Sequence, residues 1–364
     1  MFSGSYSPDD VIFLLKPVCM EYTQVSEKER LIQSGARHYS EMLSRESLPS
    51  DEYMLLFKQA LSRHQARFAT DIIRLARRIA QLHTGPITLV SLARAGTPIG
   101  ALINRVMRRL GRTAKHYSIS LIRDRGIDTV ALKFLLGNHD ADSIVFIDGW
   151  TGKGVMAREL GQAVGNLQTD PGKRLNPDLF VVADLSGTAA EAATGDDYLI
   201  PPSLLGAIVS GLISRSVVNS QVIDPGNFHG CVYQTEYSAH DLSNQFLDRI
   251  TEEIDRQWSQ AESLPLVMTN DERRLRREAS LQLLADMETR FGVHDANLIK
   301  PGIGEATRVL LRRVPSLVLL RNREHEDVRH LITLADRRHV PVLIDHQLPY
   351  HAVALIQNAG KGES

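Results

Sequence analysis

Cysteines and long apolar runs are scarce in this sequence. Its 364 residues include two cysteines, Cys19 and Cys231, which form neither a disulfide framework nor a metal-ligand pattern. The first ten residues, MFSGSYSPDD, lack the basic start and apolar core of a signal peptide, and no apolar run approaches the length of a membrane span. These absences argue against a secreted disulfide scaffold and a membrane protein, so we expect a cytoplasmic protein.

The sequence also lacks an excess of charge of either sign. Its 42 lysines and arginines nearly balance its 43 aspartates and glutamates, which gives a formal net charge of -1. That balance argues against attraction of the whole protein to nucleic acid or to an anionic membrane, but it allows a local basic face. Hydrophobic residues at 43% and charged residues at 23% are globular values, and the length favours two domains.

Apolar strands alternate with helical segments in the first half of the chain. Strands are expected at 87–92, 116–122, 143–148 and 179–184. This alternation predicts an α/β fold with a doubly wound parallel sheet, whose ligands lie at the carboxyl ends of the strands. The predicted boundaries are a first domain at 1–258 (core about 50–185, hood from 1–50 and 186–258), a linker at 259–266, and a small α/β/α domain at 267–364.

The stretch from Ile144 to Val155, IVFIDGWTGKGV, is the most informative in the sequence. An apolar strand ends in the carboxylate of Asp148, and a glycine-rich loop then opens a helix. Backbone N–H groups of such a loop, together with the helix dipole, favour a bound phosphate. In the plainer alternative the glycines only reverse the chain direction. The predicted phosphate-binding residues are Trp150, Thr151, Gly152, Lys153, Gly154 and Val155.

A second loop of small residues follows the strand at 87–92. It runs from Arg94 through Ala95, Gly96 and Thr97 to Pro98, which stands at the favoured first position of a helix. Two strand–loop–helix units would place two anion sites at the same edge of a parallel sheet. We therefore expect one loop to hold a 5'-phosphate and the other a pyrophosphate.

At these two loops the chain resembles the type I phosphoribosyltransferases. Asp148 matches the first acid of their phosphoribosyl pyrophosphate loop, Arg94 and Gly96 match their pyrophosphate loop, and Gly149 stands where a second acid is expected. The resemblance implies an enzyme that uses phosphoribosyl pyrophosphate and Mg²⁺ on a base or nucleoside-like acceptor. Asp148 would contact the ribose or the metal. Pyrophosphate would be neutralised by Arg94, Arg123 and Arg125.

Four longer segments resemble one particular family. They are SLARAGTPIG, HYSISLIRDRGID, IDGWTGKG and SGLISRSVVN. Together they are similar to a divergent bacterial phosphoribosyltransferase family that is found beside tellurium-resistance and stress-response genes. Some of its members carry a StiP-type cysteine protease label, and its C-terminal end is a Pelota-type RNA-binding domain. The resemblance covers nearly the whole chain and implies a role in a stress response.

Three further charged positions are candidate contacts in the first domain. The loop around Arg123 and Arg125 could close over the leaving group, or it could be a solvated loop whose charges pair among themselves. Asp184 ends the fourth strand, where related folds recognise the base. Arg215 interrupts a small and apolar segment, so it needs an anion or a carboxylate, and structural pairing is the default.

The C-terminal residues that match a Pelota-type RNA grip form a loop and a helix start. The resemblance implies RNA contacts there, because a Gly-X-Gly helix entrance offers backbone donors and the arginines offer charge. A basic solvated helix in a dimerisation module is the alternative, and we expect a homodimer. The predicted RNA-binding residues are Gly302, Gly304, Glu305, Arg308 and Arg312, extended by Arg313.

Two other functions stay open. One is a sensor that binds a phosphoribosyl ligand without turning it over and couples it to RNA binding, which the absent second acid supports. The other is peptide hydrolysis, which needs a thiolate with a histidine in reach. For that chemistry Cys231 is the candidate nucleophile, since it follows His229 at a spacing of two, whereas Cys19 has no such neighbour.

Overall fold

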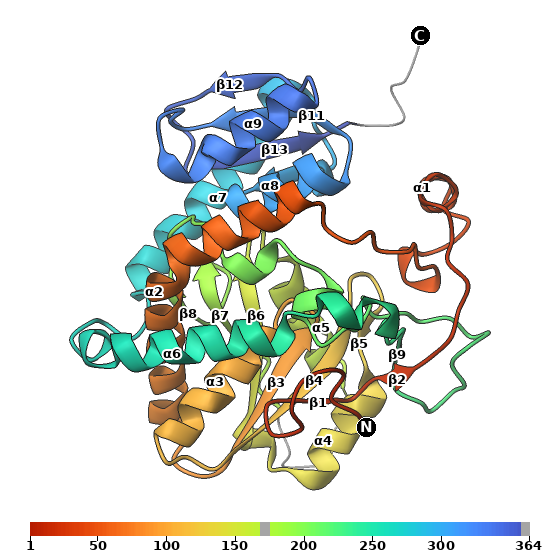
Figure 1. Cartoon of the computed structure of the whole chain (residues 1–364), viewed down its shortest axis with the longest axis vertical. Helices are drawn as coiled ribbons and strands as arrows, with labels where there is room; N and C mark the ends of the chain where they lie inside the picture. Colours follow the sequence, from red (N-terminus) through yellow and green to blue (C-terminus); the bar gives the residue numbers. More distant parts are fainter. Residues whose placement is uncertain (168–174, 358–364) are drawn as a thin grey trace.

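Two stacked α/β units make up the computed structural model, which describes residues 1–167 and 175–357. The larger unit occupies the lower part of Figure 1, and the smaller C-terminal unit, in blue, lies above it. Among the described residues, none of the helices combines the length and the apolar character that crossing a membrane requires.

The central sheet of the larger unit is parallel, as the alternation of strands and helices predicted. All neighbours in the main sheet run the same way, and the short strand β5 (Gly126–Ile127) pairs antiparallel with β4. Both edge strands lie in segments that we expected to form a hood. The strand order is β1 (Ile12–Phe13), β4 (Ala114–Ile122), β3 (Ile87–Ala93), β6 (Ile144–Thr151), β7 (Leu179–Asp184) and β8 (Glu191–Thr194).

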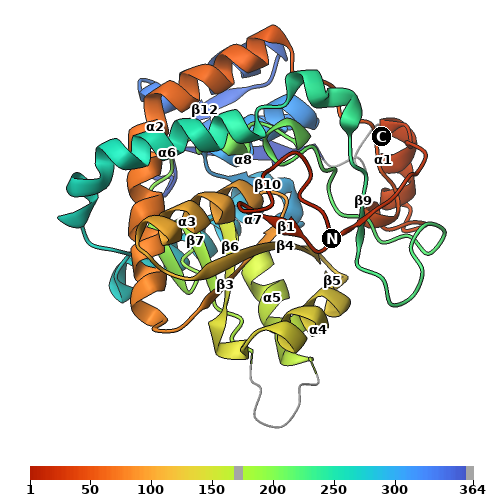
Figure 2. The same ribbon diagram turned by 60° about the horizontal axis from the view of Figure 1, so that its bottom comes forward.

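Helices cover both faces of this sheet (Figure 2). One face packs against α2 (Asp51–Leu82), α3 (Thr97–Arg109) and α6 (Ser243–Glu262), and the other against α4 (Thr129–Asn138) and α5 (Val155–Gly165). Because neither face meets water, the strands are continuous apolar runs rather than alternating ones. Successive residues of a strand point to opposite faces of the sheet. The first face includes Leu89, Ile147 and Val182, and the second includes Val90, Phe146 and Val181.

An irregular lobe flanks the sheet at the right of Figure 1. It contains α1 (Val25–Gln33) and the turn η1 (Tyr39–Glu41), and it is tied to the larger unit by pairing of β2 (Lys16–Pro17) with β9 (Gly230–Cys231). We call it the side lobe. Between β8 and α6 the chain forms short 3-10 turns, which are η3 (Pro201–Ser203), η4 (Ala207–Val209) and η5 (Thr235–His240).

The C-terminal unit begins with α7 (Asn270–Phe291), whose first turn has the expected capping box of Thr269 and Glu272. A turn, η6 (Ala296–Leu298), then leads into a four-stranded sheet that carries two helices on its inner side. The sheet order is β10 (Ile299–Pro301), β13 (Ala352–Ile356), β11 (Pro315–Leu320) and β12 (Val342–Ile344), and the helices are α8 (Ile303–Arg312) and α9 (Arg329–Arg337), the latter preceded by η7 (Glu326–Val328).

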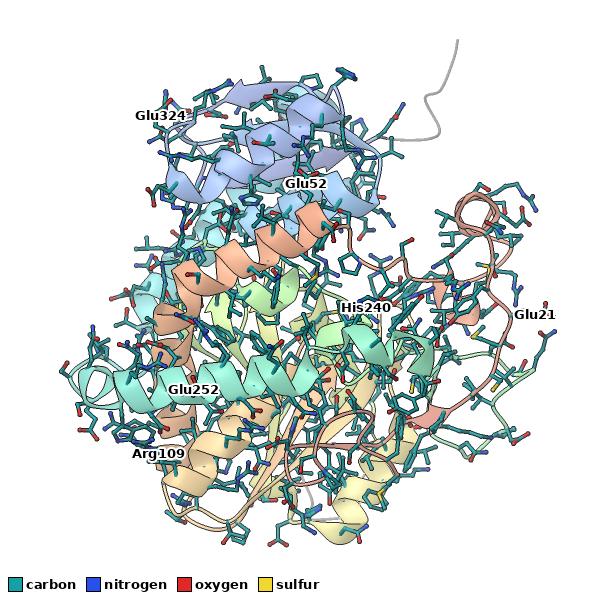
Figure 3. The ribbon with its side chains drawn as sticks, viewed as in Figure 1. Glu21, Glu52, Arg109, His240, Glu252 and Glu324 are labelled. Atoms are coloured by element: carbon teal, nitrogen blue, oxygen red, sulfur yellow. The ribbon has the colours of Figure 1, made fainter. Side chains whose placement is uncertain are left out.

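The predicted linker at 259–266 is packed rather than loose. Helix α6 continues to Glu262, the Arg74 Nε donates to the carbonyl oxygen of Pro265 at 2.5 Å, and the amide of Met268 donates to Ala192 at 2.9 Å. The two units also share one hydrophobic cluster across their contact. At its far end Arg337 of α9 pairs with Glu52, which Figure 3 labels at the start of α2. The second unit is therefore docked on the first.

Candidate functional site

The carboxyl edge of the central sheet brings the two predicted loops together. Strands β6 and β7 are in register there, so Thr151 lies opposite Asp184. The loop after β3 packs directly on β6, because a Cβ on Gly96 would meet the Ile147 carbonyl oxygen at 2.7 Å. Glycine at this position is thus required by the close approach of two backbones.

The polar groups at the end of β7 are bound by the chain itself. Asp184 is fully buried, and its carboxylate accepts from the Thr151 hydroxyl and from the amides of Ser186 at 3.1 Å and Ala189 at 2.9 Å. The Thr151 hydroxyl also contacts the Ser186 hydroxyl at 2.8 Å. Asp184 and Thr151 therefore hold the loop after β7 in place through contacts within the chain.

Asp148 is the buried acid at the end of β6. Burial raises the pKa of its carboxyl to about 7, against the opposing effects of the Gly149 amide, which donates to it at 2.8 Å, and of the positive charge of Arg308. Mg²⁺ prefers an octahedron of oxygen ligands. Across residues 1–167 and 175–357 no group of three histidine, cysteine, aspartate or glutamate side chains is placed to hold a metal ion. Within this part of the chain, Asp148 therefore has no cluster of protein ligands around it that could hold a metal ion without a bound substrate.

The predicted catalytic arginine Arg94 is held by the segment that leads into α2. It pairs with the carboxylate of Glu46, and its Nη1 donates to the carbonyl oxygen of Ile213 at 2.9 Å. Arg215 donates to the carbonyl oxygens of Tyr39 at 2.8 Å and Met42 at 2.5 Å. The contacts of Arg215 are therefore structural, which is the default expected from the sequence. Arg94 thus ties the segment before α2 to the sheet edge, and Arg215 ties the side lobe to the segment between η4 and β9.

The loop after β4 also finds its partners within the chain. Arg125 pairs with Glu41 at 2.6 Å, and Arg123 contacts Asp124 at 3.2 Å and Asn297 of the C-terminal unit at 2.9 Å. This loop therefore bridges the side lobe and the C-terminal unit. Lys153 reaches the same unit, since its ammonium donates to the Ala296 carbonyl oxygen.

The residues predicted to grip RNA face the predicted phosphate loop. A Cβ on Gly152 would lie 3.7 Å from Pro301, and one on Gly302 would lie 2.6 Å from the Leu185 side chain. The start of α8 is capped by Asp197, which accepts from the amides of Ile303 and His351 at 2.8 Å each.

Residues of α8 complete this contact. The guanidinium of Arg308 lies 5.9 Å from the centre of the Trp150 ring and pairs with Glu305 at 3.2 Å. Gly304 lies over Ser203, whose hydroxyl oxygen would be 3.5 Å from an added Cβ. The side chain of Arg312 lies outside the described residues. The residues predicted to grip RNA thus form part of the contact between the two units, and no local sequence pattern predicts that contact.

A small cavity remains where the two units meet. It measures about 20 Å³, is lined by Trp150, Asp197, Ser203 and Glu305 among others, and contains the buried Ser203 hydroxyl, which has no hydrogen-bond partner among the described residues. Such a space is enough for a water molecule. Sites for small molecules usually measure roughly 300–1,000 Å³. This cavity therefore has no room for a nucleotide-sized ligand.

The two thiols have opposite surroundings, although Cys231 lies on β9 and Cys19 follows closely after β2, the strand that pairs with β9. Cys231 on β9 is fully buried, and burial raises its pKa to about 12. His229 contacts the Ser120 hydroxyl at 2.9 Å through its Nδ1, and its backbone amide donates to Asp128 at 2.5 Å. Cys19 is exposed. The structure therefore disfavours Cys231 as a nucleophile and leaves Cys19 as the accessible thiol.

Comparison with known proteins matches both parts of the chain to families. Residues 4–251 match a family model described as tellurite-like stress resistance cysteine protease StiP, and residues 278–358 match one described as PELOTA RNA binding domain. The protein named cysteine protease StiP from Acinetobacter baylyi is 41% identical over 371 residues, which cover 99% of this chain and 96% of the relative.

Solved structures give a weaker similarity. A hypoxanthine phosphoribosyltransferase from Trypanosoma cruzi, complexed with IMP, is 11% identical with a TM-score of 0.29, covering 55% of this chain and 93% of its own. An alanine mutant from a study of an invariant aspartic acid in HPRTs is 13% identical with a TM-score of 0.27, covering 37% of this chain and 81% of its own. Scores this low carry no argument about fold or activity.

These comparisons correct the predicted activity. The expectation of a phosphoribosyltransferase is wrong, because the relative that matches almost the whole chain is named a cysteine protease. Phosphoribosyl pyrophosphate and magnesium were expected only as part of that activity, and the family matches do not support them. The predicted similarity to a stress-resistance family with a C-terminal Pelota-type domain is confirmed.

Proposed function

The chain belongs to the StiP family of tellurite-like stress resistance proteins, and from that membership we propose that it is a cysteine peptidase whose nucleophile is the thiol of Cys19. The name of the 41% identical relative supports the reaction class. The geometry of the two thiols supports the choice of residue, since Cys231 is buried and Cys19 is exposed. The exposed position of Cys19 is the single observation that carries the assignment.

The backbone around Cys19 is anchored on both sides. Before it, the amide of Val18 donates to the carbonyl oxygen of Cys231 at 2.9 Å. After it, Tyr22 bridges to Leu43, and the amide of Thr23 donates to Leu43 at 2.7 Å. Glu21, two residues away, lies on the outer edge of the side lobe in Figure 3. An accessible group on a fixed segment suits a nucleophile, because its position does not have to be ordered by the substrate.

The proposed reaction is ordinary acyl transfer. The thiolate forms a bond to the peptide carbonyl carbon, the C–N bond breaks, and the amine leaves with a proton. Water then hydrolyses the thioester and releases the acid. An unperturbed cysteine is only a few per cent thiolate at neutral pH, yet it is strongly nucleophilic. A thiol whose pKa is about 12, as for Cys231, supplies far less thiolate.

Hydrolysis of a mixed fluorogenic peptide library by the full chain tests this assignment. We expect Cys19→Ser to lose activity by at least about a hundredfold, because a hydroxyl is a much poorer nucleophile than a thiolate. Cys231→Ser should keep its activity if it stays folded by circular dichroism. Equal activity in Cys19→Ser and the parent would contradict the assignment, as would loss of activity in a folded Cys231→Ser alone.

RNA binding by the C-terminal unit is a second proposed function. The match of residues 278–358 to a PELOTA RNA binding domain favours it. Binding of the full chain to a labelled hairpin RNA with an internal bulge, followed by fluorescence anisotropy at low salt, is the direct test. Binding that weakens steeply as salt is added is expected from phosphate contacts. A parent protein that ignores such RNA would exclude this function.

A further inference from the structure

Four cations from both units line the seam where the units meet. Arg123 comes from the loop after β4, Lys153 from the loop after β6, Lys300 from β10, and Arg308 from α8. The two residues of the larger unit reach one turn of the C-terminal unit. Arg123 donates to the side chain of Asn297 at 2.9 Å and Lys153 donates to the Ala296 carbonyl oxygen, and Lys300 follows this turn directly.

These cations are close enough to repel one another. Burial lowers the pKa of Lys153 to about 8, and the charge of Lys300 lowers it further. Burial also lowers the pKa of Lys300, and Arg313, Arg123 and Arg308 act in the same direction. We call the group of Arg123, Lys153, Lys300 and Arg308 the cationic seam.

The carboxylates nearby do not balance this charge. Glu305 favours the charged forms of Lys153 and Lys300, but it already forms an ion pair with Arg308 at 3.2 Å. Asp295 also favours the charged form of Lys153, and Arg123 has Asp124 at 3.2 Å, an exposed neighbour in its own loop; these three carboxylates face four cations. Like charges held together at a partly buried surface raise the free energy of the protein. A bound polyanion would remove that cost.

Two aromatic rings accompany the cations. The guanidinium of Arg123 lies 5.7 Å from the centre of the Tyr39 ring, and that of Arg308 lies 5.9 Å from the centre of the Trp150 ring. Proteins that bind single-stranded nucleic acid combine a cationic track for the phosphates with aromatic rings on which bases stack. This combination favours RNA over an inorganic anion.

From this arrangement we propose that RNA runs along the cationic seam, with phosphates bound by residues of both units. The proposal rests on the proposed RNA binding and adds the path that the RNA follows. On this path the larger unit contributes Arg123 and Lys153, which lie outside the Pelota-type domain. Contact with both units would make RNA binding stabilise their docked arrangement, since a ligand favours the state that it binds.

The test compares single neutralised cations in the full chain. Lys153→Gln and Arg123→Gln should each weaken binding of a bulged hairpin RNA by about three- to tenfold at 0.1 M salt and lower the salt slope by about 0.7 to 0.9. Lys133→Gln is the matched control. Lys133 is an exposed lysine of the larger unit, and its helix α4 lies far from the C-terminal unit in Figure 1. This variant should bind like the parent.

Different failures have different meanings. If the parent binds RNA and both seam variants bind like Lys133→Gln, the path is overturned while RNA binding by the C-terminal unit stands. If the parent binds no RNA at low salt, both proposals fall. Polyaspartate that displaces RNA at equal charge concentration would show that the seam takes acidic peptides, and it would overturn RNA as the ligand.

Discussion

The sheet edge and the side lobe differ in how their reactive groups are occupied. At the sheet edge, Asp184, Arg94 and Asp197 are all bound by other parts of the chain, and the C-terminal unit covers the loop after β6. In the side lobe, Cys19 is exposed on an anchored segment. Loops that match a ligand-binding motif can therefore be structural, while an unremarkable segment carries the accessible thiol.

This difference follows from the requirement that buried polar groups be paired. Once the C-terminal unit docks, the charges that become buried at the sheet edge, such as Asp184 and Asp197, lose water and need a partner from the protein. The side lobe is irregular and open, so its thiol needs none. Variants that disturb one region should accordingly leave the other unaffected, and three such experiments follow in decreasing order of expected effect.

The largest effect should come from Asp197→Ala. This buried carboxylate accepts from the amides of Ile303, His351 and Ala352, and its loss leaves three buried donors without an acceptor. Since an unsatisfied buried group costs about 1 to 3 kcal/mol, we expect a loss of roughly 4 kcal/mol in the free energy of unfolding. Urea denaturation measures it.

Asp196→Ala provides the control for that experiment. Asp196 is its exposed neighbour and pairs with Arg67 at 2.6 Å on the surface. Surface ion pairs contribute about 0 to 1 kcal/mol, so this variant should unfold almost like the parent. Equal losses in the two variants would show that Asp197 does not hold the units together, and the sheet edge would then be less closed than described.

Asp148→Asn should change the pH dependence of stability. The folded protein raises the pKa of this carboxyl from 3.8 to about 7, so it binds the proton more tightly than the unfolded chain does. The resulting stabilisation is complete below about pH 3.8 and is lost as pH rises through 7. Asparagine cannot ionise, so the variant should gain stability over the parent, by roughly 2 to 3 kcal/mol at pH 8.

Urea midpoints of Asp148→Asn and the parent at pH 5 and pH 8 test this. If the difference in stability between Asp148→Asn and the parent is the same at pH 5 and pH 8, the pKa of Asp148 is not raised by burial as stated. Peptide hydrolysis by Asp148→Asn should equal that of the parent, because Asp148 belongs to the sheet edge. A loss of hydrolysis in this variant would indicate that the active site lies at the sheet edge and not in the side lobe.

A smaller effect should come from two histidines between the units. Burial is the main cause that lowers the pKa of His330 and His351 to about 4. Because the unfolded chain takes up these protons near pH 6.5, the stability that the neutral rings give is complete above that pH and is lost as pH falls toward 4. His330 also lines a cleft of about 530 Å³ between α2 and α9, beside the His64–Asp327 pair at 3.1 Å.

Between pH 6.5 and pH 5, His330→Gln should therefore lose about 1 kcal/mol less unfolding free energy than the parent does. Glutamine can keep a hydrogen bond to the Thr307 hydroxyl, which contacts His330 Nε2 at 2.7 Å. The slope of the unfolding free energy against pH is the quantity to compare. An unchanged slope would show that His330 does not sense pH in the docked arrangement.

Local sequence patterns predicted the elements but not how they are covered. The apolar runs at Ile87 and Ile144 located the central parallel strands, and Thr269 with Glu272 located the start of α7. The edge strand β8 was not predicted, because a strand of four residues leaves little periodicity to recognise. Docking of the second unit depends on Asp197, whose role follows from contacts distant in sequence.

The ranking of the two thiols also depends on a property that the sequence does not show. Spacing to His229 favoured Cys231, but spacing does not report burial, and β9 lies within the hydrophobic cluster. Cys19 lies outside both paired strands and is exposed, and its exposure is a tertiary property. The Arg215 interactions were anticipated, since a charged residue in an apolar segment needs a partner wherever it is.

Covalent trapping is the most direct measurement of the central claim, that Cys19 is the nucleophile. The full chain is incubated with a peptidyl chloromethyl ketone library at neutral pH and digested, and the modified thiol is identified by mass spectrometry. The account predicts modification at Cys19, slowed by competing peptide substrate, with Cys231 unmodified until the protein unfolds. Modification of Cys231 in the folded protein, or labelling of Cys19 that substrate does not slow, would contradict it.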